Sequence, residues 1–263
     1  MNASEYQKWM ERAFLFVEAA LAHEMATPSR MCMTEEYFRT SLVRGLANSI
    51  PQNAARVATE EDAAWGSNAC WRNGCGQTPG QGRPIQHDVA VKPDANDNGL
   101  LCEVKWMKAA NAAAIAKDIW KLVLSRSNVP EGQAIRCYLL LGGETDAFAG
   151  TIDTLRANHV DLRWRNATGG GMSPARRQLN LKKLLQTKLG SDALESTLSW
   201  GTHFRQPSVC WERLVLTRRC EPWVRTLDGN GWRAVLFEVH HHGALNDLHL
   251  DTVTFNNRLK FTC

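Results

Sequence analysis

The segments Ile85–Val91 (IQHDVAV) and Leu100–Trp106 (LLCEVKW) decide the fold of this chain. Both are largely apolar and have the length of a β-strand. The segment between them, Pro93–Gly99 (PDANDNG), consists mostly of Pro, Asp, Asn and Gly, the residues that favour turns. Two such runs joined by a turn predict a β-hairpin.

The predicted hairpin carries three ionisable residues at its centre. Side chains alternate between the two faces of a strand, so Glu103 and Lys105 point the same way, and the pairing of the strands brings Asp88 toward them. The opposite face takes Cys102, Val104 and Trp106. Burying two acids and an amine together is costly unless they pair or hold a cation, so this cluster is a candidate functional site.

The triplet alone is a weak signal. An acid-x-Lys triplet is expected by chance about once in a chain of this length. A solvated edge hairpin with an incidental ion pair is therefore the alternative. The surroundings favour a functional site, because an Asp-bearing strand precedes the triplet and helical patterns lie on both sides.

Asp88, Glu103 and Lys105 resemble the active centre of the PD-(D/E)xK nuclease superfamily, the restriction-endonuclease-like fold. The resemblance extends over about Thr34 to Gly143 and departs from the family name at one position, because His87 and not proline precedes the aspartate. It implies a metal-dependent nuclease that hydrolyses phosphodiester bonds, with DNA favoured over RNA, in defence, repair or mobile-element processing. The alternative is a catalytically inactive protein of that fold that binds nucleic acid or assembles with other chains.

The resemblance also implies a metal site. Mg²⁺, for which Mn²⁺ is expected to substitute, would be held by Asp88, Glu103 and the main-chain carbonyl of Val104. Lys105 would orient or help deprotonate the attacking water, or stabilise charge on the phosphate. Glu35, near the start of the preceding helix, best matches an additional acidic ligand, and Glu36 is its competitor. Both acids are also explained by the helix dipole alone.

Helical periodicity surrounds the hairpin. Four further elements are predicted from it and from apolar runs: helices at Glu5–Glu24, Thr34–Ser49 and Lys108–Arg126, and a strand at Ala134–Leu141 that ends at Gly142-Gly143. The order helix, hairpin, helix, strand agrees with the resembled fold. We expect the α/β class, with a central mixed sheet flanked by helices (a restriction-endonuclease-like core) and a C-terminal α+β extension. The expected divisions are an N-terminal helix (1–33), a nuclease-like core (34–145) and the extension (146–263), packed on the core or continuous with it.

The C-terminal part is harder to interpret. We expect a short strand at Asp161–Arg165 and a helix over Leu179–Leu198 that is broken at Gly190. Two long antiparallel strands are expected at Val209–Leu216 and Arg233–His240.

Basic residues gather in one part of the chain. The net charge is +4, and eight basic residues against the single acid Asp161 occur between positions 156 and 188. This run could neutralise phosphates or could be an ordinary solvated surface. The candidate nucleic-acid contacts are Arg72, Lys117, Arg176, Arg177, Lys182 and Lys183.

Other patterns give weaker signals. No signal peptide or membrane span is predicted, so a cytoplasmic protein with mostly reduced cysteines is expected. Cys70 and Cys75 are spaced more widely than a usual zinc knuckle. The run His240–His242 is interpreted as a polar cluster, because consecutive residues in a strand face opposite ways.

Overall fold

The computed structural model describes residues 3–26, 34–50, 56–62, 86–92, 99–127, 135–160, 176–179, 183–184, 186–200, 208–209, 214–220, 223–225, 231–241, 248–251 and 260–262. The helices are α1 (Ala3–Ala26), α2 (Glu35–Ser49), α3 (Ala112–Ser127), α4 (Thr145–Ala157) and α6 (Lys188–Trp200). The strands are β1 (Val57–Asp62), β2 (Gln86–Val91), β3 (Gly99–Met107), β4 (Ile135–Glu144), β5 (Arg176–Leu179), β6 (Ser208–Val209), β7 (Leu214–Cys220), β8 (Trp223–Arg225), β9 (Gly231–His241), β10 (Leu248–Asp251) and β11 (Lys260–Thr262).

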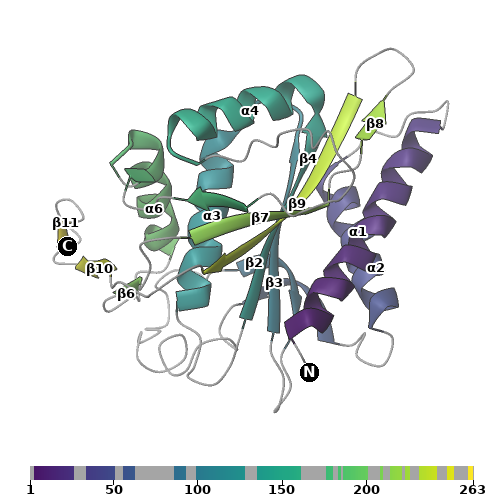
Figure 1. Cartoon of the computed structure of the whole chain (residues 1–263), viewed down its shortest axis with the longest axis horizontal. Helices are drawn as coiled ribbons and strands as arrows, with labels where there is room; N and C mark the ends of the chain where they lie inside the picture. The colour runs from purple at the N-terminus through teal and green to yellow at the C-terminus, as the bar shows by residue number, and fades with distance from the viewer. Residues whose placement is uncertain are drawn as a thin grey trace.

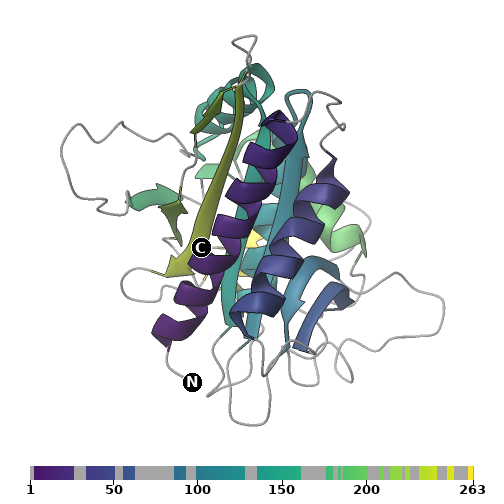
Figure 2. The ribbon, with the colours of Figure 1, turned by 90° about the vertical axis from the view of Figure 1, so that its right-hand side faces the viewer.

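One mixed sheet organises the fold. Its eight strands follow the order β1-β2-β3-β4-β9-β7-β5, with β8 paired to β9, and β3 and β4 are its parallel pair. Helices α1 and α2 lie on one side of the sheet and α3, α4 and α6 on the other (Figures 1 and 2). The predicted α/β class with a central mixed sheet flanked by helices is confirmed. β11, β10 and β6 form a separate three-stranded sheet.

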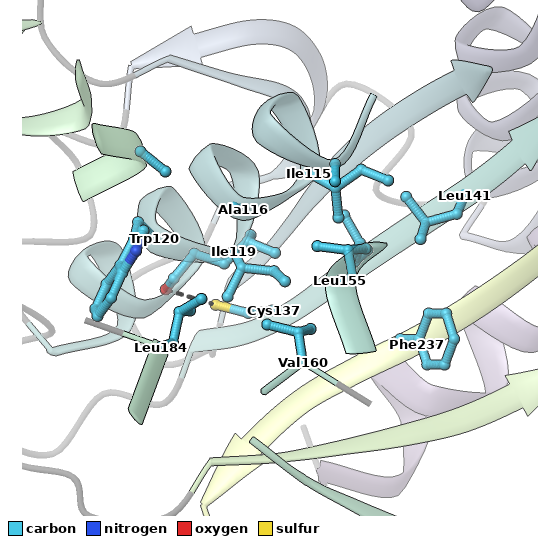
Figure 3. Packing of buried hydrophobic residues seen from close by; sticks show 14 of the residues in the cluster. Ile115, Ala116, Ile119, Trp120, Cys137, Leu141, Leu155, Val160, Leu184 and Phe237 are labelled. Carbon is cyan, nitrogen blue, oxygen red and sulfur yellow. Dashed lines mark hydrogen bonds between the residues drawn. The ribbon is translucent and has the colours of Figure 1, made fainter. Parts of the chain in front are cut away.

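The two faces of the sheet carry two hydrophobic cores. β3 is buried along almost its whole length, since helices cover both of its faces. On the α1/α2 face its alternate residues Cys102, Val104 and Trp106 join one core, as the alternation predicts. The opposite core packs α3, α4 and α6 against β3, β4 and β9, and Figure 3 shows the side chains of Trp120 and Phe237 within it. A solvated edge hairpin is thereby contradicted.

The two N-terminal helices form largely as predicted. The side-chain oxygen of Thr34 accepts a hydrogen bond from the Tyr37 N–H at 3.1 Å, which caps α2. α1 packs closely against α2 at Gly45. A Cβ added there would lie 2.6 Å from the carbonyl oxygen of Ala13, so only glycine allows this approach.

The helix after β3 begins later than predicted. α3 starts at Ala112 and not at Lys108, because the Asn111 side-chain oxygen accepts from the Ala114 N–H at 3.2 Å and caps the helix there. The four preceding residues instead turn the chain from β3 onto the face of the sheet.

The strand expected to end at Gly142-Gly143 continues through both glycines to Glu144. Gly142 has no room for a side chain, since an added Cβ would lie 2.7 Å from Phe38 Cζ and 2.8 Å from Trp106 Cε3. Gly142 therefore makes room for two aromatic rings, and neither glycine ends the strand.

The C-terminal expectations need three corrections. The predicted helix over Leu179–Leu198 is wrong in its first part, which contains the end of β5. Gly190 does not break α6, and its carbonyl accepts a hydrogen bond from Trp120 Nε1 at 3.2 Å. The strand predicted at Val209–Leu216 is two separate strands, β6 and β7, which belong to different sheets.

The second C-terminal strand forms as predicted. β9 covers the expected Arg233–His240 and pairs antiparallel with β7. The short strand expected at Asp161–Arg165 and the cysteines Cys70 and Cys75 lie outside the described residues. None of the described helices is long and apolar enough to cross a membrane.

Candidate active site

The sheet opens between β2 and β3. These strands pair antiparallel from Val91 opposite Leu100 as far as Val89 opposite Cys102. Beyond that point β2 stays paired with β1, and β3 stays paired with β4 to its end. The opening lies where Asp88 and Glu103 would continue the pairing, and the same register places these two residues on one face.

Carboxylates take the place of the missing strand contacts. The main-chain N–H of Val104 donates to Asp88 Oδ2 at 2.7 Å, and that of Trp106 donates to Glu35 Oε2 at 3.3 Å. Both N–H groups belong to a buried strand and need acceptors. The opening is therefore closed by one acid from β2 and one from the N-terminus of α2.

Lys105 lies between acids from two helices. Its Nζ donates to Glu35 Oε1 at 3.0 Å and lies 3.8 Å from Asp118 Oδ2 on α3. Burial of Lys105 acts to lower its pKa, but Asp118, Glu35 and Asp88 together outweigh burial and raise it above the ordinary value. The neighbouring acids therefore favour the protonated form of Lys105.

Glu103 is fully buried and holds two partners. Its Oε1 lies 2.5 Å from His87 Nδ1, and its Oε2 accepts from Lys121 Nζ at 2.6 Å. Burial raises the pKa of Glu103 to about 8 against the lowering effect of Lys121, and burial lowers the pKa of His87 to about 3. A neutral imidazole and a carboxyl group that resists ionisation therefore face each other.

Helix α3 contributes two charged residues to the site. Asp118 and Lys121 are three positions apart, so they share one face of the helix, and both are buried. Burial, followed by the charge of Glu103, raises the pKa of Asp118. Burial lowers the pKa of Lys121, but Glu103 and Asp118 outweigh it and raise that pKa. Asp118 Oδ2 is buried without a hydrogen-bond partner.

Most of the site residues predicted from the sequence gather at the opening, and one does not. Asp88, Val104 and Lys105 lie at the opening, with Glu103 beside it under α3, and Glu35 joins them. Glu36 does not, because it is exposed and pairs with Arg39. Lys117 lies near the acidic cluster, where burial, followed by the charge of Lys121, lowers its pKa.

The remaining nucleic-acid candidates are not placed at this site. Arg176 and Arg177 lie on β5, at the other end of the sheet order from β2, and Lys183 is exposed ahead of α6. Arg72 and Lys182 lie outside the described residues.

Sequence reasoning gave no role to three residues that contact the predicted ones: His87, Asp118 and Lys121. For two of them, Asp118 and Lys121, the sequence does contain a signal. Asp118 and Lys121 lie beside the apolar stripe that includes Ile115 and Ile119, in the helix that directly follows the Glu-x-Lys strand. Charged residues at the border of a buried stripe are candidates for a buried site.

No family model matches the chain, and no curated protein and no solved structure matches it. The site must therefore be judged on its own geometry.

The donor atoms fit a hard divalent cation. Asp88, Glu103 and Glu35 offer carboxylate oxygens, and each oxygen has two lone pairs, so the existing contacts leave capacity to accept a cation. With Asp118, four carboxyl groups gather with the ammonium groups of Lys105 and Lys121. A divalent cation would favour the ionised forms of Glu103 and Asp118, whose pKa values burial raises. Within the described ranges, no three His, Cys, Asp or Glu side chains are already arranged as a metal-binding group.

Proposed function

We propose that this chain is a metal-dependent nuclease of the PD-(D/E)xK type that hydrolyses phosphodiester bonds. The observation that carries the proposal is the opening between β2 and β3, around which Asp88, Glu103, Lys105 and Glu35 gather. The order α2, β2, β3, α3, β4 supports the restriction-endonuclease-like core. The resemblance alone favours DNA over RNA as the substrate. The proposed biological settings are defence, repair or mobile-element processing.

The metal ion would be Mg²⁺, or Mn²⁺ in its place, held by Asp88, Glu103, the carbonyl of Val104 and Glu35. When bound, the cation supplies positive charge to the phosphate and orients a water molecule for attack. Asp88 is fixed for this role by its bond to the Val104 N–H. Glu103 is fixed by His87 and Lys121, which act as supporting contacts for a ligand.

Of the roles expected of Lys105, the metal-free site favours the cationic one. The raised pKa of Lys105 favours the protonated amine, which suits the stabilisation of charge that develops on a phosphate. A pocket of about 270 Å³ lies beside it, lined by Glu35, Lys105, Lys108 and Asn111 among others. Two lysines on its wall favour an anionic ligand, and the size suits part of one nucleotide.

The proposal is tested by incubating the purified chain with duplex DNA, single-stranded DNA and RNA, each in Mg²⁺, in Mn²⁺ and in EDTA. Cleavage that requires the metal supports it. Intact substrates under all conditions would reject it.

The alternative is a protein of the same fold that binds nucleic acid or other chains without catalysis. One observation favours it: both oxygens of Glu103 already hold partners, Lys121 among them. An inactive protein would need no further cation. Calorimetric titration with Mn²⁺ separates the two, because stoichiometric binding that Asp88→Ala abolishes is expected only for the nuclease.

A further inference from the structure

Asp118 lies between the two lysines of the site. Its Oδ2 is 3.8 Å from Lys105 Nζ, and its Oδ1 is 3.8 Å from Lys121 Nζ. The side chain is 7% exposed, so water gives it little solvation. Both distances are too long for a hydrogen bond.

The lack of a hydrogen bond at Asp118 Oδ2 requires an explanation. A buried polar atom without a partner is costly, and such atoms mark functional sites or strain. Charge balance for Lys121 does not supply the explanation, because Lys121 already donates to Glu103 at 2.6 Å. The oxygen without a partner belongs to the pair with Lys105.

Lys105 donates a hydrogen bond to one acid, Glu35, which is also a proposed metal ligand. Glu35 Oε1 accepts from Lys105 at 3.0 Å. If Glu35 held a cation, Lys105 would lose this acceptor. Asp118 Oδ2 is then the nearest described acid, and a movement of about 1 Å converts their 3.8 Å separation into a hydrogen bond.

We propose that Asp118 is a positioning residue: it takes over the amine of Lys105 when Glu35 is engaged and so keeps the ammonium directed at the scissile phosphate. The inference rests on the proposed nuclease function. Its structural part is that the hydrogen bond of the Lys105 amine changes acceptor from Glu35 to Asp118. That change can be tested without any substrate.

Selective ¹H–¹⁵N spectroscopy of lysine ammonium groups tests that change of acceptor, since a lysine signal sharpens when the amine is held by an acceptor. The Lys105 signal is assigned by its absence in Lys105→Arg. We expect the signal to persist in Glu35→Ala, because Asp118 holds the amine, and to vanish in Glu35→Ala combined with Asp118→Leu. Loss of the signal in Glu35→Ala alone would overturn the inference, and that single variant decides the question even if the double variant is unstable.

A kinetic experiment tests the functional part. Asp118→Leu is expected to lower kcat by about 10- to 100-fold, the usual effect of removing a supporting contact. The KM for DNA and the Mn²⁺ dissociation constant should stay within about twofold of wild type. Asp118→Asn keeps one acceptor oxygen and should retain more of kcat.

The matched control is Asp153→Leu, an exposed aspartate on α4 that pairs with Arg156. It should leave kcat unchanged. Weakened Mn²⁺ binding in Asp118→Leu would instead make Asp118 a ligand and overturn the positioning role. If wild-type protein cleaves no substrate, the nuclease proposal fails while the lysine spectra still decide where the amine is held.

Discussion

Replacing Glu103 by Gln should make the metal-free protein less sensitive to rising pH while abolishing its activity. Glu103 is fully buried, and burial raises its pKa from 4.5 to about 8. A carboxyl group with a raised pKa binds its proton more tightly in the folded chain than in the unfolded chain. The stabilisation from that proton is complete below about pH 4.5 and is lost as the pH rises through about 8.

The size of the effect follows from the pKa. Each pH unit between the unfolded and folded values costs about 1.4 kcal/mol of the free energy of unfolding. His87 makes the free energy of unfolding rise with pH, because its pKa is lowered from 6.5 to about 3. That rise is complete by about pH 6.5. Asp118 also has a raised pKa, but it is present in both proteins, so between about pH 6.5 and about pH 8 wild type should lose about 2 kcal/mol relative to Glu103→Gln.

Urea unfolding in EDTA across this pH range measures the difference. In Glu103→Gln, Lys121 faces an amide in place of a carboxyl group, which lowers the free energy of unfolding by a constant amount. That amount does not change how steeply the free energy of unfolding falls with pH. Glu144→Gln is the matched control, because Glu144 is exposed, and its curve should parallel that of wild type within about 0.5 kcal/mol. Parallel curves for wild type and Glu103→Gln would refute the assignment of a buried, hard-to-ionise Glu103.

Four further outcomes are expected. Asp88→Ala abolishes cleavage and lowers the free energy of unfolding by about 1 to 3 kcal/mol, since it removes a ligand and the acceptor of the buried Val104 N–H; retained cleavage would place the site elsewhere. Lys105→Ala loses turnover, whereas calorimetry still detects Mn²⁺ binding; weakened binding would indicate a structural role. Mg²⁺ affinity rises up to about tenfold per pH unit below about pH 8, because binding must displace the Glu103 proton, and a flat profile would exclude Glu103 as a ligand. Charge reversal at Arg176 and Arg177 reduces the slope of log affinity against log salt by about one for each lost phosphate contact, and an unchanged slope would assign them to ordinary surface.

The sequence predicts the part of the fold around the hairpin well, because local signals agree there. The apolar stripes of α1 and α2, the Thr34 cap and the alternation in β3 all specify the same structure. The C-terminal strands were harder to predict from the sequence. β9 pairs with β4 and β7, which are distant in sequence, and no local pattern specifies such partners.

The site was predicted only where strand geometry determines it. Alternation and hairpin pairing bring together Asp88, Glu103 and Lys105. The contacts of Asp118 and Lys121 depend on how α3 packs over β3, which periodicity does not specify beyond the buried stripe. The opening between β2 and β3 is likewise a tertiary feature, since it appears only where the two strands follow different neighbours.

The most direct test of the central claim is the cleavage rate of one DNA substrate by wild type and by Asp88→Ala, purified identically, in Mg²⁺ and in EDTA. The proposal predicts cleavage by wild type in Mg²⁺ alone and none by the variant under either condition. Equal cleavage by both proteins would assign the activity to another site or to a contaminant. No cleavage by wild type in Mg²⁺ or Mn²⁺, on any of the three nucleic acids, would contradict the nuclease function itself.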